Sequence, residues 1–221
     1  GFKRPIIHLR HPINMRPQML AEFFGTWFMV GIGCGSVALG APVWLISLAF
    51  GGAVTLAILV LQPVSGAHIN PAVSIAFART GHLEKHLLIP YIVAQLAGGL
   101  AAGIMLGGVG STALAPGVST AEGIAIEVFI TFALMASIYW SVVKSETHIS
   151  IAFFVGGAVA VLAYFFGPLT GASMNPARTF GPNIVSGMYF SLIFYSITTI
   201  IGALIAAEAY LRFYPTENNQ D

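Results

Sequence analysis

The chain has 221 residues, of which 57% are hydrophobic and 8% are charged, and its formal net charge is +1. A soluble domain usually carries about 25% charged residues, so this composition excludes a soluble globular protein and indicates a protein embedded in lipid. The sequence has no run of basic residues that would favour nucleic-acid binding, and its single cysteine, Cys34, excludes an intrachain disulfide.

Six stretches of the sequence are long and apolar enough to cross a bilayer. A bilayer core of about 30 Å requires roughly 20 apolar residues in an α-helix. The stretches that meet this requirement are 19–40, 43–62, 87–107, 121–143, 149–167 and 189–213. We therefore expect an all-α membrane protein with six transmembrane helices.

Two shorter elements interrupt this pattern, and both begin with the same motif. Segments 65–72 and 170–177 share Gly-Ala-x-x-Asn-Pro-Ala, which places Asn70 and Asn175 at equivalent positions 105 residues apart. Asn is a favoured N-cap and Pro is tolerated at the first helical position, so each motif predicts the start of a helix. A helix of about ten residues rises about 15 Å, half the thickness of the bilayer core, so each is expected to be a half-helix.

The two halves of the sequence also match outside these motifs. Glu22 and Glu127 lie 105 residues apart, the same offset as the two asparagines. We therefore divide the chain into a first repeat at 1–107, a linker loop at 108–120 and a second repeat at 121–221. Because each repeat has an odd number of spans, the second must be inserted upside down relative to the first. Such inverted repeats place their sites near the bilayer midplane, at broken helices.

The basic residues indicate the orientation of the chain. Eight of the nine fall on one face of the predicted topology, namely Lys3, Arg4, Arg10, Arg16, Arg79, Lys85, Lys144 and Arg212. Because positively charged loops stay in the cytoplasm, we expect a multi-pass protein of the plasma or inner membrane with both termini cytoplasmic. On this face Arg212 follows Glu208 by four residues, a spacing that predicts a local ion pair. The ninth, Arg178, lies in the second half-helix, and an intramembrane charge indicates a functional site.

The sequence resembles the aquaporin, or major intrinsic protein, family over essentially its whole length. The resemblance is carried by segments 21–26, 65–73 and 171–182, which contain Ala-Glu-Phe-Phe-Gly-Thr and the two Asn-Pro-Ala motifs, the second followed by Arg. It implies six tilted helices and two half-helices around a narrow pore, in an inverted 3+3 repeat, and a homotetramer. It implies no cofactor, no metal and no catalytic residue, so the chain is not expected to be an enzyme.

The resemblance places the two asparagines at the centre of the pore. Asn70 and Asn175 are expected to cap their half-helices through the side-chain oxygen and to donate their amide N–H groups to a water molecule. A water that accepts from both cannot relay a proton, and the facing helix N-termini add a barrier to protons and cations. Glu22 and Glu127 are expected to hold the loops that lead into the half-helices. His68 either lines or gates the cytoplasmic mouth, or is a structural histidine.

Four residues are predicted to form the outer selectivity filter by resemblance to the family, namely Phe50, Ala163, Ala172 and Arg178. In this arrangement Arg178 donates to the permeant and repels cations. Water-selective members typically have His where this chain has Ala163, and a methyl group in place of an imidazole widens the constriction. A frame shifted by one residue would put Tyr164 at that position and narrow the pore again.

The second motif resembles that of the nodulin-26-like branch of the family and its bacterial relatives, which is associated with glycerol, urea and uncharged metalloid acids such as arsenous or boric acid. Gly181, where glycerol facilitators typically have Asp, departs from that other subgroup. We therefore predict a passive channel for water and small uncharged solutes that excludes protons and ions. Two alternatives stay open: a strictly water-selective aquaporin, or a secondary transporter. A transporter would need titratable side chains at the midplane, where the motifs supply amides and one arginine.

Overall fold

The computed structural model describes residues 15–144 and 147–214, and all the regular structure in them is helical. These residues form α1 (Arg16–Ala38), α2 (Val43–Ser65), α3 (Pro71–Thr80), α4 (Lys85–Met105), α5 (Thr120–Lys144), α6 (His148–Thr170), α7 (Pro176–Val185) and α8 (Tyr189–Phe213). Six of them are long and apolar enough to cross a membrane, as the sequence predicts. The other two, α3 and α7, are the half-helices, each of ten residues.

Two of the spans are longer than predicted because each continues through a proline. α2 continues through Pro63 to Ser65, and α6 continues through Pro168 to Thr170, whereas the predicted spans end just before each proline. A proline removes one helical hydrogen bond, but a helix can end after it when a cap follows. Both helices close at the next residue, a glycine with φ of 85° after α2 and 76° after α6, whose N–H donates to the carbonyl four residues earlier.

The helices form two equivalent sets of four that run in opposite directions. α1 packs against α2 and α4, just as α5 packs against α6 and α8. α7 of the second set packs against α4, and α3 of the first set packs against α8. α2 and α6 pack against each other at the centre, where the two sets meet. This arrangement confirms the inverted 3+3 repeat.

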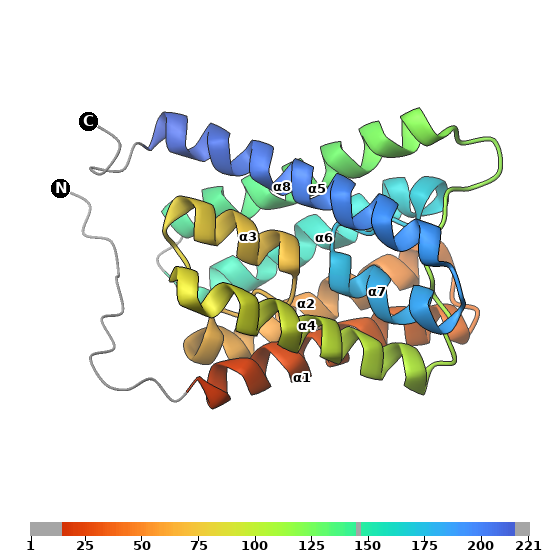
Figure 1. The fold of residues 1–221 in the computed structure, drawn as a ribbon, viewed down its shortest axis with the longest axis horizontal. Coiled ribbons are helices and arrows are strands. Elements are labelled where there is room, and N and C mark those ends of the chain that lie inside the picture. Colours follow the sequence, from red (N-terminus) through yellow and green to blue (C-terminus); the bar gives the residue numbers. More distant parts are fainter. Residues whose placement is uncertain (1–14, 145–146, 215–221) are drawn as a thin grey trace.

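The half-helices α3 and α7 enter the molecule from opposite ends, and their N-termini meet in the middle (Figure 1). Their close packing against the long helices depends on glycine. A Cβ atom on Gly181 of α7 would overlap the carbonyl oxygen of Gly99 in α4. The backbones of α4 and α7 therefore touch directly, which brings the half-helix into the interior of the helix bundle.

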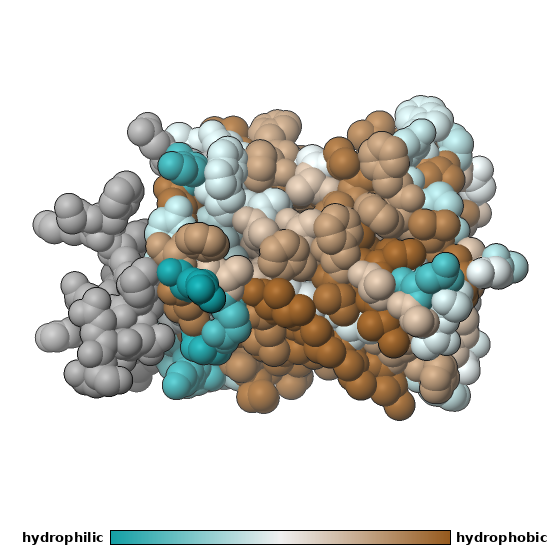
Figure 2. Space-filling model, turned by 90° about the horizontal axis from the view of Figure 1, so that it is seen from above, coloured by the Kyte–Doolittle hydropathy of each residue, from teal (hydrophilic) through white to brown (hydrophobic). Residues whose placement is uncertain are grey.

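The surface has an apolar band between two more polar ends (Figure 2). Large apolar side chains of the long helices are exposed, for example Val60 of α2 at 68% and Phe153 of α6 at 64%. Arg16, Arg79, Lys85, Lys144 and Arg212 lie where α1 and α4 begin and α3, α5 and α8 end, all at one end of the molecule (Figure 1), which we term the basic end. The other predicted basic residues of this face, Lys3, Arg4 and Arg10, lie outside the described residues.

One charged contact differs from the prediction. Glu208 does not pair with Arg212 but with Arg79 of α3, whose Nε lies 2.7 Å from Glu208 Oε1. Helical spacing alone favoured Arg212, but the half-helix α3 packs against α8 and brings Arg79 within reach of Glu208. The side chains are 46% and 56% exposed, so the pair adds little to stability.

Candidate functional site

Glu22 in α1 holds the loop that joins α2 to the half-helix α3. Its Oε1 accepts hydrogen bonds from Ser65 Oγ at 2.7 Å and from the His68 N–H at 2.9 Å. Its Oε2 accepts from the Ile69 N–H at 2.6 Å and from Gln95 Nε2 at 2.8 Å. The carboxylate is fully buried, and it satisfies backbone N–H groups that no helix would satisfy.

Glu127 in α5 holds the second loop with three of the same four contacts, because the one from Gln95 has no counterpart among the hydrogen bonds that the described residues make to Glu127. Its Oε1 accepts from Thr170 Oγ1 at 2.6 Å and from the Ser173 N–H at 3.0 Å, and its Oε2 accepts from the Met174 N–H at 3.2 Å. Each donor lies 105 residues after its counterpart in the first half. Both carboxylates thus accept hydrogen bonds from the loops that lead into the half-helices.

Two tyrosines that the sequence analysis did not single out fix the other side of these loops. Tyr91 Oη donates to the Ser65 carbonyl at 2.8 Å, and Tyr195 Oη donates to the Thr170 carbonyl at 2.6 Å. Both tyrosines are buried. They lie 104 residues apart, one fewer than the 105-residue offset of the repeat, so a comparison of the two halves at that offset pairs Tyr91 with Ser196 and misses them. Each loop is therefore held by a carboxylate from one helix and a phenol from another.

The loops are strained at four positions that are not glycine. Their φ values are 51° at Ala67, 44° at Ile69, 40° at Ala172 and 51° at Met174. A left-handed backbone at such residues costs on the order of 1–3 kcal/mol and persists only where the surroundings enforce it. The buried carboxylates enforce it here, and strain of this kind is typical of functional sites.

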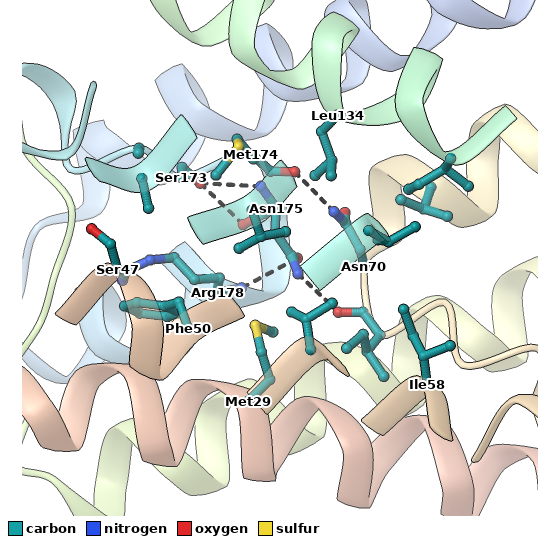
Figure 3. A pocket seen from close by; sticks show the side chains of 18 of the residues that line it. Met29, Ser47, Phe50, Ile58, Asn70, Leu134, Ser173, Met174, Asn175 and Arg178 are labelled. Carbon is teal, nitrogen blue, oxygen red and sulfur yellow. Dashed lines mark hydrogen bonds between the residues drawn. The ribbon is translucent and has the colours of Figure 1, made fainter. Parts of the chain in front are cut away.

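Asn70 and Asn175 stand at the N-termini of the two half-helices and line a common cavity (Figure 3). Asn70 Oδ1 accepts from the Ala72 N–H at 2.9 Å, and Asn175 Oδ1 accepts from the Ala177 N–H at 2.9 Å. The side-chain oxygens cap the half-helices as predicted.

The sequence predicts that both amide nitrogens of these asparagines donate their N–H groups into the pore. In the structure each nitrogen instead uses one N–H group within the protein. Asn70 Nδ2 donates to the Met174 carbonyl at 2.8 Å, and Asn175 Nδ2 donates to the Ile69 carbonyl at 2.8 Å. Each amide has two N–H groups, so one ties the two halves together and one is left for the cavity. These two reciprocal hydrogen bonds form because each loop brings a carbonyl beside the asparagine of the other half. The spacing of residues within one half cannot reveal such a contact.

A cavity of about 300 Å³ passes through the centre of the molecule. Its lining includes Val43, at the start of α2, and Val142, near the end of α5, which belong to opposite ends of the bundle. The two asparagines lie between them. Most of the lining is apolar, so the cavity offers few polar groups and each of them matters for what passes.

Arg178 lies on the side of the asparagines away from the basic end. Its Nη1 donates to the Gly110 carbonyl at 2.5 Å, and its Cζ lies 4.7 Å from the centre of the Phe50 ring. Arg178 is 6% exposed, and the ring and the carbonyl both favour its positive charge. The guanidinium is thus fixed against one wall of the cavity (Figure 3).

Ala163 and Ala172 line the same cavity as Phe50 and Arg178, so the structure brings the four predicted filter residues together. Tyr164, the alternative to Ala163, is 48% exposed on the outer surface of α6. The lining at these two alanine positions therefore consists of methyl groups.

Gly110 is a part of this region that the sequence analysis missed. It lies in the linker, has a φ of 82°, and a Cβ atom there would lie 2.7 Å from Cys34 Sγ. A backbone carbonyl is present at every position of the chain, so nothing in the sequence distinguishes the one that contacts the arginine.

His68 both lines the cavity and makes structural contacts. Its Nδ1 lies 3.0 Å from Ser74 Oγ, and its ring packs edge-on against Phe77 and Tyr91 with centroid distances of 4.9 and 5.3 Å. The two readings that the sequence left open are thus compatible, because one edge of the ring is fixed while the residue still borders the cavity.

The site offers hydrogen-bond donors, one fixed cation and apolar walls. Within residues 15–144 and 147–214, no group of three or more His, Cys, Asp or Glu side chains is placed to hold a metal ion. An arrangement of this kind suits the passage of a small polar molecule.

Comparison with known proteins agrees with this geometry. The family model described as major intrinsic protein matches residues 9–210. The chain belongs to the major intrinsic protein family. Members of this family are passive channels rather than enzymes, so this chain is a channel protein of the aquaporin type.

Several curated aquaporins resemble this family member over most of its length. Aquaporin NIP1-3 of Oryza sativa subsp. japonica is 35% identical over 221 residues, covering 93% of this chain and 77% of the relative. Aquaporin-4 of Mus musculus is 34% identical over 209 residues, covering 86% and 65%. Aquaporin AqpM of Methanothermobacter thermautotrophicus is 32% identical over 241 residues, covering 90% and 97%. The similarity to plant proteins of the nodulin-26-like type confirms the resemblance found in the motifs.

The fold of this aquaporin also matches a solved structure. The X-ray structure of the aquaglyceroporin from Plasmodium falciparum superimposes with a TM-score of 0.78 over 92% of this chain and 97% of that chain. The two sequences are 22% identical, so this similarity supports the fold alone.

Proposed function

We propose that this aquaporin passively conducts water and small uncharged solutes, with glycerol, urea and metalloid acids such as arsenous acid as the solute class, and excludes protons and ions. The observation that carries the proposal is the lining beside Arg178. Ala163 and Ala172 line the cavity there together with Phe50, so methyl groups stand where a bulkier side chain would narrow the passage.

The chemistry of this lining suits a neutral solute that is partly polar and partly apolar. Arg178 offers N–H donors to a hydroxyl or carbonyl oxygen and repels cations. The Phe50 ring and the two methyl groups offer an apolar surface to the carbon side of the same solute. An ion gains no comparable replacement for its hydration shell from an apolar wall, so it stays outside.

Proton exclusion is proposed to occur at Asn70 and Asn175. Each retains one amide N–H for the cavity, and the N-termini of α3 and α7 face each other at this point. A water molecule that accepts from these donors is oriented against relaying a proton, and the positive ends of the two helix dipoles oppose cations.

We propose that the channel is a homotetramer of a plasma or inner membrane, with both termini in the cytoplasm. The exposed apolar side chains of the long helices support contact with lipid or with neighbouring copies. The basic end supports the orientation, because positively charged segments are retained in the cytoplasm.

The proposal is tested by measuring permeation in proteoliposomes. Stopped-flow light scattering follows water flux in an impermeant sorbitol gradient and solute flux in glycerol and urea gradients, and a separate uptake assay follows arsenous acid. Protein-free liposomes are the control. We expect water and at least one of the solutes to pass faster than in the control.

The two alternatives give different results in this assay. Accelerated water flux with every solute at the control rate would show a strictly water-selective aquaporin. Accumulation of a solute above its external concentration, driven by a proton or sodium gradient, would show a secondary transporter, because a passive channel only equalises concentrations.

A further inference from the structure

The half of the cavity between the asparagines and the basic end is largely apolar. Its walls on α2, α3, α5 and α6 include Ile58, Val73, Phe77, Ile138, Ile151 and Val155. A solute with several hydroxyl groups loses hydrogen bonds to water here without gaining partners from these side chains. Passage through this half therefore depends on whatever polar groups the lining provides.

Within the part of the chain that the structure describes, Gln62 and His68 are the polar side chains that line this half of the cavity, and one edge of the His68 ring is already fixed by Ser74. Gln62 lies in the last turn of α2 and lines the cavity. Its side-chain Oε1 is buried and has no hydrogen-bond partner among the residues that the structure describes. Buried polar atoms are almost always paired, so an unpaired amide oxygen in a residue that lines a passage points to a partner that the oxygen meets when the side chain rotates toward the cavity.

The position of Gln62 is fixed by its neighbours in the loop. Its backbone carbonyl accepts from the Gly66 N–H at 2.9 Å, which closes α2. Gly66 in turn lies against His68, since a Cβ atom on the glycine would be 3.2 Å from His68 Nε2. Gln62 and His68 thus flank the same glycine, and both border the cavity.

An amide group suits solutes that carry hydroxyls. Its oxygen accepts and its nitrogen donates, and rotation of the side chain exchanges the two ends. Hydroxyl groups are also both donors and acceptors, so either orientation of the amide can pair with them. Water is also both a donor and an acceptor, but it is small enough to keep hydrogen bonds to other water molecules in the passage. Its permeation therefore depends less on a single side chain.

We propose that Gln62 is a specificity-determining residue that hydrogen-bonds hydroxyl-bearing solutes in the basic-end half of the pore. The inference rests on the proposed solute function of the channel. Conduction through a pore requires several sites of modest affinity, so that a solute enters and leaves each one. Gln62 supplies such a site beyond the asparagines, after the solute has left Arg178.

The test replaces the amide by a side chain of similar length that forms no comparable hydrogen bonds. Gln62→Met is reconstituted beside the wild-type channel and Val60→Met, which places the same side chain on the exposed face of the same helix. Water and glycerol permeabilities are measured on matched amounts of protein. We expect Gln62→Met to lower glycerol permeability about fivefold, the change that about 1 kcal/mol in a barrier produces, with water permeability altered less than about twofold.

The water signal of each variant also shows whether the protein has folded, and Gln62→Asn, which keeps an amide, is expected to retain more glycerol flux than Gln62→Met. If glycerol and water fall together in Gln62→Met, or neither falls, the inference about Gln62 is overturned while the solute function stands. If the wild-type channel passes no glycerol, this role of Gln62 fails; if it passes neither urea nor arsenous acid as well, the proposed function fails with it.

Discussion

Arg178 illustrates how single residues set the chemistry of the pore. Its guanidinium donates to the Gly110 carbonyl and lies over the Phe50 ring, so its position is determined by two other parts of the chain, the linker and α2. Fixing a long flexible side chain costs about 2 kcal/mol of rotamer entropy, and these two contacts offset that cost. Ala163 and Ala172 line the cavity beside Arg178 with only methyl groups, so they determine how wide the passage is at this point.

Ala163→His is expected to convert the channel toward water selectivity. The imidazole fills space beside the guanidinium and adds a hydrogen-bonding group that water can use. Glycerol permeability should fall at least about tenfold, equivalent to about 1.4 kcal/mol in the barrier, while water permeability stays within about threefold. The two rates are read by stopped-flow light scattering. Unchanged glycerol flux in a folded variant would show that the constriction lies elsewhere.

Glu127→Gln is expected to destabilise the protein because one carboxylate oxygen becomes an NH₂ group. Either the Ser173 or the Met174 N–H then faces a donor, and an unsatisfied buried group costs about 1–3 kcal/mol. The thermal unfolding midpoint in detergent should fall by several degrees. Glu84→Gln, an exposed carboxylate at the start of α4, is the matched control and should unfold near the wild-type temperature. Equal midpoints for both variants would contradict the supporting role of Glu127.

At the scale of elements, the half-helices depend on how closely their neighbours approach. α3 and α7 are too short to span a bilayer, and isolated helices of this length are only marginally stable in water. They are held by asparagine caps, by loops bound to buried carboxylates and by backbone contact with the long helices. The crossing of α2 and α6 joins the two repeats in the same way, since Gly51 and Gly156 face each other there.

Gly156→Ala and Gly157→Ala test this crossing with adjacent residues. A Cβ atom on Gly156 would overlap Thr55 Oγ1 and lie 2.5 Å from the Gly51 carbonyl oxygen, whereas one on Gly157 meets no atom within 4 Å. Gly156→Ala should therefore lower the yield of folded protein and its unfolding temperature, and Gly157→Ala should not. Size-exclusion chromatography and thermal unfolding in detergent measure both. Equal behaviour of the two variants would show that the crossing tolerates a wider separation.

At the scale of the whole molecule, the inverted repeat makes the two ends similar in shape but different in charge. Arg16, Arg79, Lys85, Lys144 and Arg212 belong to the basic end, and Arg178 lies within the other half. The same pore is therefore reached through a basic surface on one side only. This asymmetry predicts which way the channel faces in the membrane.

Cysteine labelling tests the orientation. Cys34 is buried, so the wild-type chain should react little with a membrane-impermeant maleimide. Ala113 is an exposed residue of the linker, and Glu84 is an exposed residue at the basic end. Ala113→Cys should be labelled in intact cells, and Glu84→Cys only after the membrane is permeabilised. The opposite pattern would place the basic end outside the cell.

The sequence by itself predicted the features that depend on local patterns. The six spans follow from runs of apolar residues, and the half-helices follow from Asn-Pro, because capping acts within a few residues. The equal spacing of Glu22 and Glu127 indicated the repeat, and the resemblance to the family implied that both carboxylates lie beside the loops. Composition and motif were also enough to indicate the family.

The tertiary structure decided the contacts between distant segments. It gave one amide N–H of each central asparagine to the other half, paired Glu208 with Arg79, and placed the Gly110 carbonyl on the arginine of the filter. These contacts join residues between 68 and 129 positions apart. Their partners are backbone groups or side chains with no distinctive local signal, so they are selected only when helices from both halves pack together. The physical reason is that periodicity and capping act along one segment, whereas a pore is formed between segments.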